Sequence, residues 1–344
     1  MSTLATRPAR TREGRVRPVV VAGLAVGVVG LLAVASLAYG ARDVGWGTVL
    51  DAWLRPDVSD GDHAVVLARL PRTVVGLLVG AALGLSGAVM QGVARNPLAD
   101  PGILGVSAGA ALAVVVAIAG FGIDSLAGYV WFAFAGAAVA AVVVYAVSSL
   151  GRDGATPVKL ALAGAAMSAG LASLTNAVLV VDQDTFDRYR NWALGSVAVR
   201  SWATVTDVLP FLVVGTAIAL GTGRVLNGLA LGDDSARALG QRTGLGRGVA
   251  ALAVVLLCGA ATAVAGPIVF VGLVVPHAAR ALVGGDYRWV LPVSALLGGA
   301  LLVGADTIGR VVLPPTEVQA GLMTALVGAP VFVWLIRRRS AVSL

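Results

Sequence analysis

The sequence has little charge and almost no cysteine or histidine. Only 12% of its 344 residues are charged and 6% are aromatic, whereas 58% are hydrophobic and the mean hydropathy is +0.90. So little charge cannot cover a soluble globule of this length, and the composition therefore predicts a polytopic membrane protein. The single cysteine, Cys258, lies in an apolar run, which excludes a disulfide framework and a cysteine metal site.

Other absences narrow the function. The two histidines, His63 and His277, lie far apart and supply no catalytic or metal-binding cluster, which argues against a membrane enzyme. No series of intramembrane carboxylates offers a proton relay or coupling-ion site, which disfavours a secondary transporter. No G-x-x-x-x-G-K-[ST] motif is present, so the chain cannot bind ATP through a P-loop. Basic residues are scattered at the ends of apolar runs, and nucleic-acid binding is not expected.

Segments of bilayer length recur ten times, so we expect an all-α fold of about ten transmembrane helices. They lie at about 18–40, 73–92, 103–121, 128–150, 158–181, 204–223, 248–265, 267–284, 290–309 and 319–337. With both termini inside, most basic residues fall on the inner side, as the positive-inside rule requires. We expect a basic tail over 1–17, one transmembrane domain over 18–339 and a short tail over 340–344. Glycine and proline in GPIVFVGLVVPH are expected to interrupt the helices near 248–284.

Three stretches have functional potential. The polar, helix-breaking stretch VMQGVARNPLADPGILGVSAG follows the second span, where it predicts either a gate or an ordinary proline turn. The spacing of Gly76, Gly80 and Gly84 predicts close helix packing. The fifth span carries polar side chains that suit either a hydrated path or contacts between helices, namely Ser168, Ser173, Thr175 and Asn176.

The longest inner loop, VLNGLALGDDSARALGQRTGLGRG, predicts a short helix. Asp233 and Asp234 stand near its start, Arg237 near its middle and Gly240 after its end, an arrangement that complements the helix dipole. Such a helix serves equally well as an interfacial anchor or as a docking element.

Long motifs resemble the FecCD family, the permease subunits of bacterial ABC importers for ferric siderophores, haem and vitamin B12. They are RLPRTVVGLLVGAALGLSGAVMQGVARNPLADPGILGVSAGA, LALGDDSARALG, GPIVFVGLVVPHAARALVGGDYRWVLP and the closing GADTIGR…GLMTALVGAPVFVWLIRRR. The resemblance runs from about residue 40 to the C-terminus. It implies ten transmembrane helices in the bacterial plasma membrane, with both termini cytoplasmic.

The resemblance also implies partners. Two permeases, identical or paralogous, surround a path lined partly by the fifth helix, two ATPases bind ATP and magnesium below, and a periplasmic or lipid-anchored binding protein docks above. The chain itself would be neither catalytic nor cofactor-dependent. Substrate choice in the family rests largely with the binding protein. Ferric siderophore is the preferred substrate because it is the commonest assignment in the family, with vitamin B12 or haem as the alternative.

The family's roles fall on matching positions of this sequence. The inner gate is expected at Asn96, Pro97, Leu98 and Ala99, together with Thr156 in the 151–157 loop. The coupling segment, about 226–246, contacts the ATPase through Leu231, Gly232, Asp233, Asp234, Arg237, Ala238, Leu239 and Gly240. Binding-protein docking is expected at Arg69, Arg72 and Arg310, whose forked guanidinium groups suit carboxylates. Arginines capping helix ends at the membrane interface are the alternative interpretation.

Overall fold

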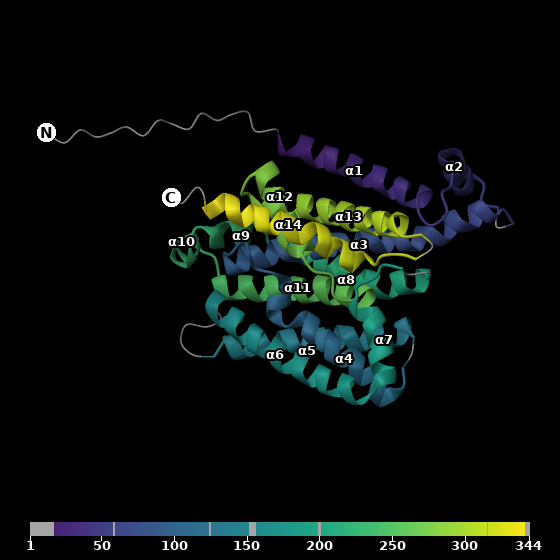
Figure 1. Cartoon of the computed structure of the whole chain (residues 1–344). Coiled ribbons are helices and arrows are strands. Elements are labelled where there is room, and N and C mark those ends of the chain that lie inside the picture. The colour runs from purple at the N-terminus through teal and green to yellow at the C-terminus, as the bar shows by residue number, and fades with distance from the viewer. Residues whose placement is uncertain are drawn as a thin grey trace.

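A computed structural model describes residues 17–57, 59–123, 125–150, 156–198, 201–314 and 316–340, and within them every regular element is helical (Figure 1). The elements are α1 Pro18–Ala38, α2 Trp46–Leu54, α3 Gly61–Ala94, the 3-10 helix η1 Pro101–Leu104, α4 Val106–Phe121, α5 Leu126–Ser148, α6 Pro157–Val181, α7 Gln183–Ala193, α8 Trp202–Gly221, α9 Gly223–Ala230, α10 Asp233–Ala238, α11 Thr243–Ala265, α12 Val271–Val283, α13 Tyr287–Val312 and α14 Ala320–Ser340. The expected tails, 1–17 and 340–344, lie almost entirely outside the described residues.

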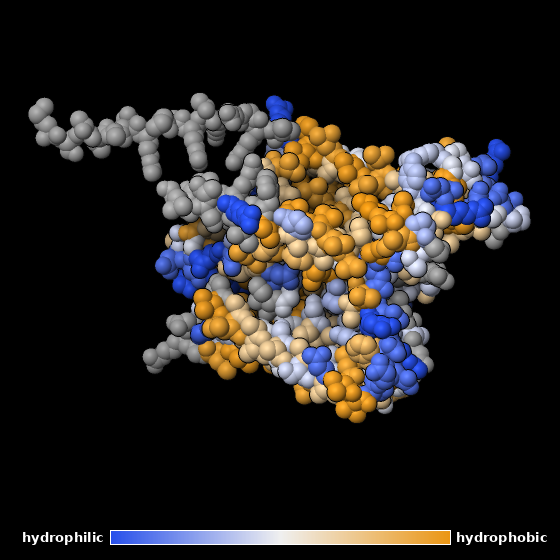
Figure 2. All heavy atoms as spheres, viewed as in Figure 1, coloured by the Kyte–Doolittle hydropathy of each residue, from blue (hydrophilic) through white to orange (hydrophobic). Residues whose placement is uncertain are grey.

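Each of the ten expected spans coincides with a helix. Among the described residues, seven helices are long and apolar enough to cross a bilayer, and α4, α12 and the apolar part of α14 are shorter apolar helices. Apolar side chains cover the middle of the molecule in Figure 2, and hydrophilic ones gather at its two ends. The expectation of an all-α, multi-pass membrane protein is confirmed.

Helix α3 is longer than hydropathy predicts. It begins at Gly61 instead of near residue 73, because the Asp60 carboxylate accepts hydrogen bonds from the amides of Asp62 and His63 and caps the helix. Arg69 and Arg72 lowered the hydropathy of this stretch without interrupting the helix. With 34 residues, α3 is about 51 Å long and exceeds the ~30 Å hydrocarbon core.

The close packing predicted from Gly80 and Gly84 joins α3 to α13. A Cβ added to Gly80 would lie 2.3 Å from the carbonyl oxygen of Gly298, and one on Gly84 would lie 2.3 Å from that of Ser294. The two backbones therefore touch, as small residues allow in helix pairs. The predicted spacing is confirmed as a packing face.

The expected interruption after α11 is also confirmed. Gly266 has φ 73° and Phe270 has φ 70°, and between them the chain is not helical, so α12 begins at Val271 and has only 13 residues. A side chain on Gly266 would meet the carbonyl oxygen of Trp192 at 2.2 Å, so glycine is required by both conformation and space.

The ends of the bundle differ in their elements (Figure 1). The start of α1, the end of α14, α9 and α10 lie at one end, called here the α10 end, whereas α2 and α7 lie at the other, called the α2 end. Helices α2 and α7 were not predicted, because nine and eleven residues are too few for a search based on bilayer length.

Candidate functional site

The expected gate is a compact turn that begins as soon as α3 ends. Arg95 closes the helix in the left-handed region, with φ 48°, and the side chain of Asn96 accepts a hydrogen bond from the amide of Leu98 at 2.9 Å. Ala99 donates its amide to the carbonyl of Asn96 at 3.1 Å and is fully buried, whereas Leu98 is exposed. The turn is thus held by its own hydrogen bonds, as asparagine turns commonly are.

After this turn the chain runs back into the bundle through the short 3-10 helix η1, without an α-helix. Asp100 caps η1 by accepting from the amide of Gly102 at 2.8 Å, and Gly105, with φ 73°, leads into α4. A Cβ on Gly272 of α12 would lie 3.1 Å from Pro101 Cδ and 3.2 Å from the carbonyl oxygen of Leu83. Since Leu83 precedes the end of α3 by three turns, the irregular backbone lies deep within protein, the condition under which membranes tolerate it.

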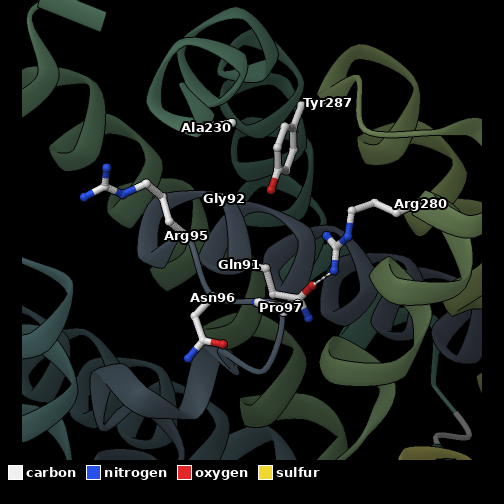
Figure 3. Close-up of a pocket in the computed structure, with 8 residues that line it drawn as sticks. All are labelled: Gln91, Gly92, Arg95, Asn96, Pro97, Ala230, Arg280 and Tyr287. Atoms are coloured by element: carbon white, nitrogen blue, oxygen red, sulfur yellow. Dashed lines mark hydrogen bonds between the residues drawn. The ribbon is translucent and has the colours of Figure 1, made fainter. Parts of the chain in front are cut away.

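A polar cavity of about 290 Å³ lies beside the turn (Figure 3). It is lined by Gln91, Gly92, Arg95, Asn96, Pro97, Ala230, Arg280 and Tyr287. The side-chain amide of Gln91 donates to the carbonyls of Gly272 and Leu273 at 3.3 and 3.2 Å, and its oxygen accepts from Arg280. Gln91 therefore joins α3 to α12 directly above the turn.

The expected coupling segment folds into α9 and α10. Gly232, with φ 99°, connects them, Asp233 and Asp234 occupy the first turn of α10, and Gly240 follows it with φ 79°, so the predicted short helix is confirmed. Ala236 is buried, whereas Leu231 and Leu239 are each 66% exposed. Asp234 and Arg237 form an exposed local pair at 3.4 Å.

Asp233 is the ionic centre of this end. Arg247 Nη2 donates to its two carboxylate oxygens at 2.8 and 3.0 Å, and Arg95 Nη1 lies 3.4 Å from Oδ1. Burial raises the pKa of this carboxyl, but the hydrogen bond and charge of Arg247, with the charges of Arg95 and Arg237, outweigh burial, so the pKa lies below its usual value.

The three arginines expected to dock a binding protein lie at the α2 end, and all three are engaged within the chain. Arg69 donates to the carbonyls of Leu37, Ala38 and Arg42. Arg72 pairs with Asp306 at 2.8 Å and with Glu317 at 2.7 Å.

Arg310 differs from the expectation, because it is only 2% exposed and cannot present its charge at the surface described here. Its guanidinium lies 3.2 Å from Asp306 and donates to the carbonyl oxygen of Ser36 at 3.0 Å and to its hydroxyl at 2.7 Å. The side chain thus joins α13 to α1 inside the bundle.

The four polar residues of the fifth span lie on α6 but do not form one face. Ser173 and Asn176 are exposed, Ser168 is half-buried and Thr175 is buried. Ser173 and Thr175 donate to carbonyls one turn back, at Ala169 and Leu171, a bond that needs no second helix. Thr156 caps α6 through the amide of Lys159 at 3.4 Å, and residues 151–155 of the expected gate loop lie outside the described residues.

Sequence reasoning missed Gln91, Arg280, Tyr287, Arg247 and Asp306. Each is a polar residue inside or beside an apolar run, and such residues are costly in a membrane unless they have a partner. That cost was the available signal. Asp306 also stands one turn before its partner Arg310 on α13, but the other partners lie on other helices and could not be read from the sequence.

The fold and the site together define a membrane transport permease, a multi-pass helical bundle in which a non-helical turn, anchored by the buried Ala99, meets two short helices at one end. Comparison with known proteins agrees. The FecCD transport family matches residues 24–338, and the chain belongs to that family.

Relatives share most of their length with this chain. A Bacillus subtilis protein named as the siderophore transport system permease YfiZ is 45% identical over 88% of this chain and 91% of its own length. The Escherichia coli ferric enterobactin transport system permease FepD is 46% identical over 89% and 91%. A solved structure described as an inward-facing ABC transporter of the metal-chelate type has a TM-score of 0.81 and 27% identity, and the match covers 93% of this chain and 99% of that one.

Proposed function

We propose that this chain carries ferric siderophores across the bacterial plasma membrane as the permease subunit of an ATP-driven importer. The observation that carries the proposal is the identity of 45% and 46% with permeases named for a siderophore and for ferric enterobactin, over nearly the whole chain. Because the sequence contains no P-loop, the energy must come from a partner ATPase, which would bind ATP and magnesium. The same partner distinguishes this importer from a secondary transporter.

We place the ATPase contact at the α10 end. Leu231 and Leu239 expose most of their side chains beside the charged residues of α10, and apolar side chains on an otherwise polar end suit a protein interface. Residues 226–246 would dock on a pair of ATPases, and both chain termini would lie on the same, cytoplasmic side.

Substrate delivery belongs at the α2 end. The side chain of Arg72 is 14% exposed and that of Arg310 is 2% exposed, so a binding protein could reach Arg72 more readily than Arg310. Docking by Arg69 and Arg72 remains our proposal. Arg310 would support that edge from inside.

We assign the path itself to α6 and to the turn at Asn96–Ala99. In an apolar stretch of 18 residues within α6, only 11% of the residues are buried. Ser173, Asn176 and several alanines are therefore free to face a second permease, either identical or paralogous, across a wide path. The turn at Asn96–Ala99 and the start of α6 at Thr156 would open and close the inner mouth in alternating access.

The test is uptake of a radiolabelled ferric siderophore by cells that lack this chain and by cells in which it is restored. Labelled cobalamin and haem are measured in parallel, because a Halobacterium salinarum cobalamin permease is 43% identical and a Yersinia pestis hemin permease is 36% identical. Loss and rescue of siderophore uptake alone supports the proposal. Loss of cobalamin or haem uptake instead would refute the substrate while keeping the importer, and unchanged uptake of all three would refute the function.

A further inference from the structure

One carboxylate joins three elements at the α10 end. Asp233 is the first residue of α10, Arg247 lies in the second turn of α11, and Arg95 stands between α3 and the turn at Asn96. Arg247 is largely buried and holds Asp233 through two hydrogen bonds, whereas the partly exposed Arg95 is joined to it by a single contact of 3.4 Å. The short helix is therefore attached both to the bundle and to the start of the turn.

Arg95 adopts a left-handed backbone conformation that a residue with a side chain rarely adopts. Arg95 and Phe270 are the non-glycine residues with positive φ in the described part of the chain. Glycine is the usual residue where a helix ends in this conformation, because any side chain adds strain there. In Figure 3 the Arg95 side chain points away from Gln91 and Arg280, and a Cβ on Gly232, next to Asp233, would lie 4.0 Å from Arg95 Nη1.

We propose that Arg95 is a positioning residue that transmits movement of α10 to the gate turn through Asp233. The inference rests on the proposed function, because α10 moves in this way only if a partner ATPase pulls on it. When α10 shifts, Asp233 carries the guanidinium of Arg95 with it, and Arg95 is bonded through the backbone to Asn96, the first residue of the turn. Arg247 keeps Asp233 oriented, so removing Arg95 detaches the turn and leaves α10 in place.

The experiment reconstitutes the complete importer in liposomes, with its ATPase and binding protein, and measures ferric siderophore imported and ATP hydrolysed in the same sample. For Arg95→Gln we expect import per ATP to fall about two- to fivefold, the factor that a partly exposed ion pair supports, with ATP hydrolysis nearly unchanged. Arg95→Lys, which keeps the charge, restores most of the ratio. Arg288→Gln is the control, since Arg288 is exposed at the start of α13 and forms no salt bridge among the described residues.

A double-mutant cycle identifies the partner. If Arg95 acts through Asp233, then Arg95→Gln combined with Asp233→Asn lowers import per ATP no further than Asp233→Asn alone. Additive losses overturn the inference. So does an unchanged ratio in Arg95→Gln, or an equal loss of hydrolysis and import, which would indicate a structural role only. If the wild-type complex fails to import any siderophore, the proposed function fails before the variants are compared.

Discussion

Replacing Gly80 with alanine tests the contact between α3 and α13. The added Cβ would lie 2.3, 2.8 and 2.9 Å from the Gly298 oxygen, the Gly298 carbon and the Gly299 Cα, all of them backbone atoms. No side chain can rotate away, so one helix must move by about 1 Å to restore normal contact. Overpacking of this kind costs about 1–3 kcal/mol. Alanine also favours the helix by about 0.8–1.0 kcal/mol, which partly hides that cost.

The control removes this ambiguity. Gly27 of α1 has no atom within 4 Å of an added Cβ, so Gly27→Ala gains the same helix propensity without the clash. We therefore expect Gly80→Ala to melt about 2–6 °C below Gly27→Ala in detergent, taking about 2 °C per kcal/mol for a chain of this size. Melting temperatures within 1 °C of each other would contradict the backbone contact between the two helices.

Three further predictions concern single residues. Asp306→Ala leaves Arg310 buried without its carboxylate, which should cost about 3–5 kcal/mol of stability and sharply lower the yield of folded protein on gel filtration. The control Asp62→Ala breaks the exposed pair with Arg42 and should leave that yield unchanged. Because the folded-state pKa of Asp233 is lowered, the stabilisation that its carboxylate provides is present above pH about 4 and is lost as pH falls through that lowered pKa. The melting temperatures of wild type and Asp233→Asn should therefore differ at pH 6 and converge at acidic pH. A difference that stays constant with pH would refute the ion pairs. Cys258 is buried and is the chain's single cysteine, so a maleimide should label the native protein less than a tenth as fast as the denatured protein, and equal rates would place that face of α11 at the surface.

Hydropathy predicted the ten apolar helices because a helix that lies in a bilayer must consist of consecutive apolar residues. A run of consecutive residues can be read directly from the sequence. Hydropathy failed where polar residues continue a helix, as at Arg69 and Arg72 in α3, and where helices are too short to cross a membrane, as in α2 and α7. Local capping signals were nevertheless present: Asp60 caps α3, and Asp182 accepts from the amides of Asp184 and Thr185 at the start of α7.

The candidate site was predictable only in part. The motifs located the turn and the short helix, but pairing depends on which helices pack together. Arg280 lies 189 residues from Gln91, and Asp233 lies 138 residues from Arg95. For the same reason a sequence indicates that Arg310 stands near the end of a span and one turn after Asp306, but not that Ser36 of α1 already holds its guanidinium.

The two ends of the bundle resist movement to different degrees. At the α2 end, Asp306 and Arg310 are almost fully buried, and separating them would leave a charge unpaired inside the protein, at a cost of several kcal/mol. At the α10 end, Arg95 and Asp233 are both partly exposed, so water replaces the lost contact and separation costs about 1 kcal/mol or less. A pull from the ATPase proposed above would therefore displace the contact between Arg95 and Asp233 first, while the charge network at the α2 end keeps α1, α3 and α13 together.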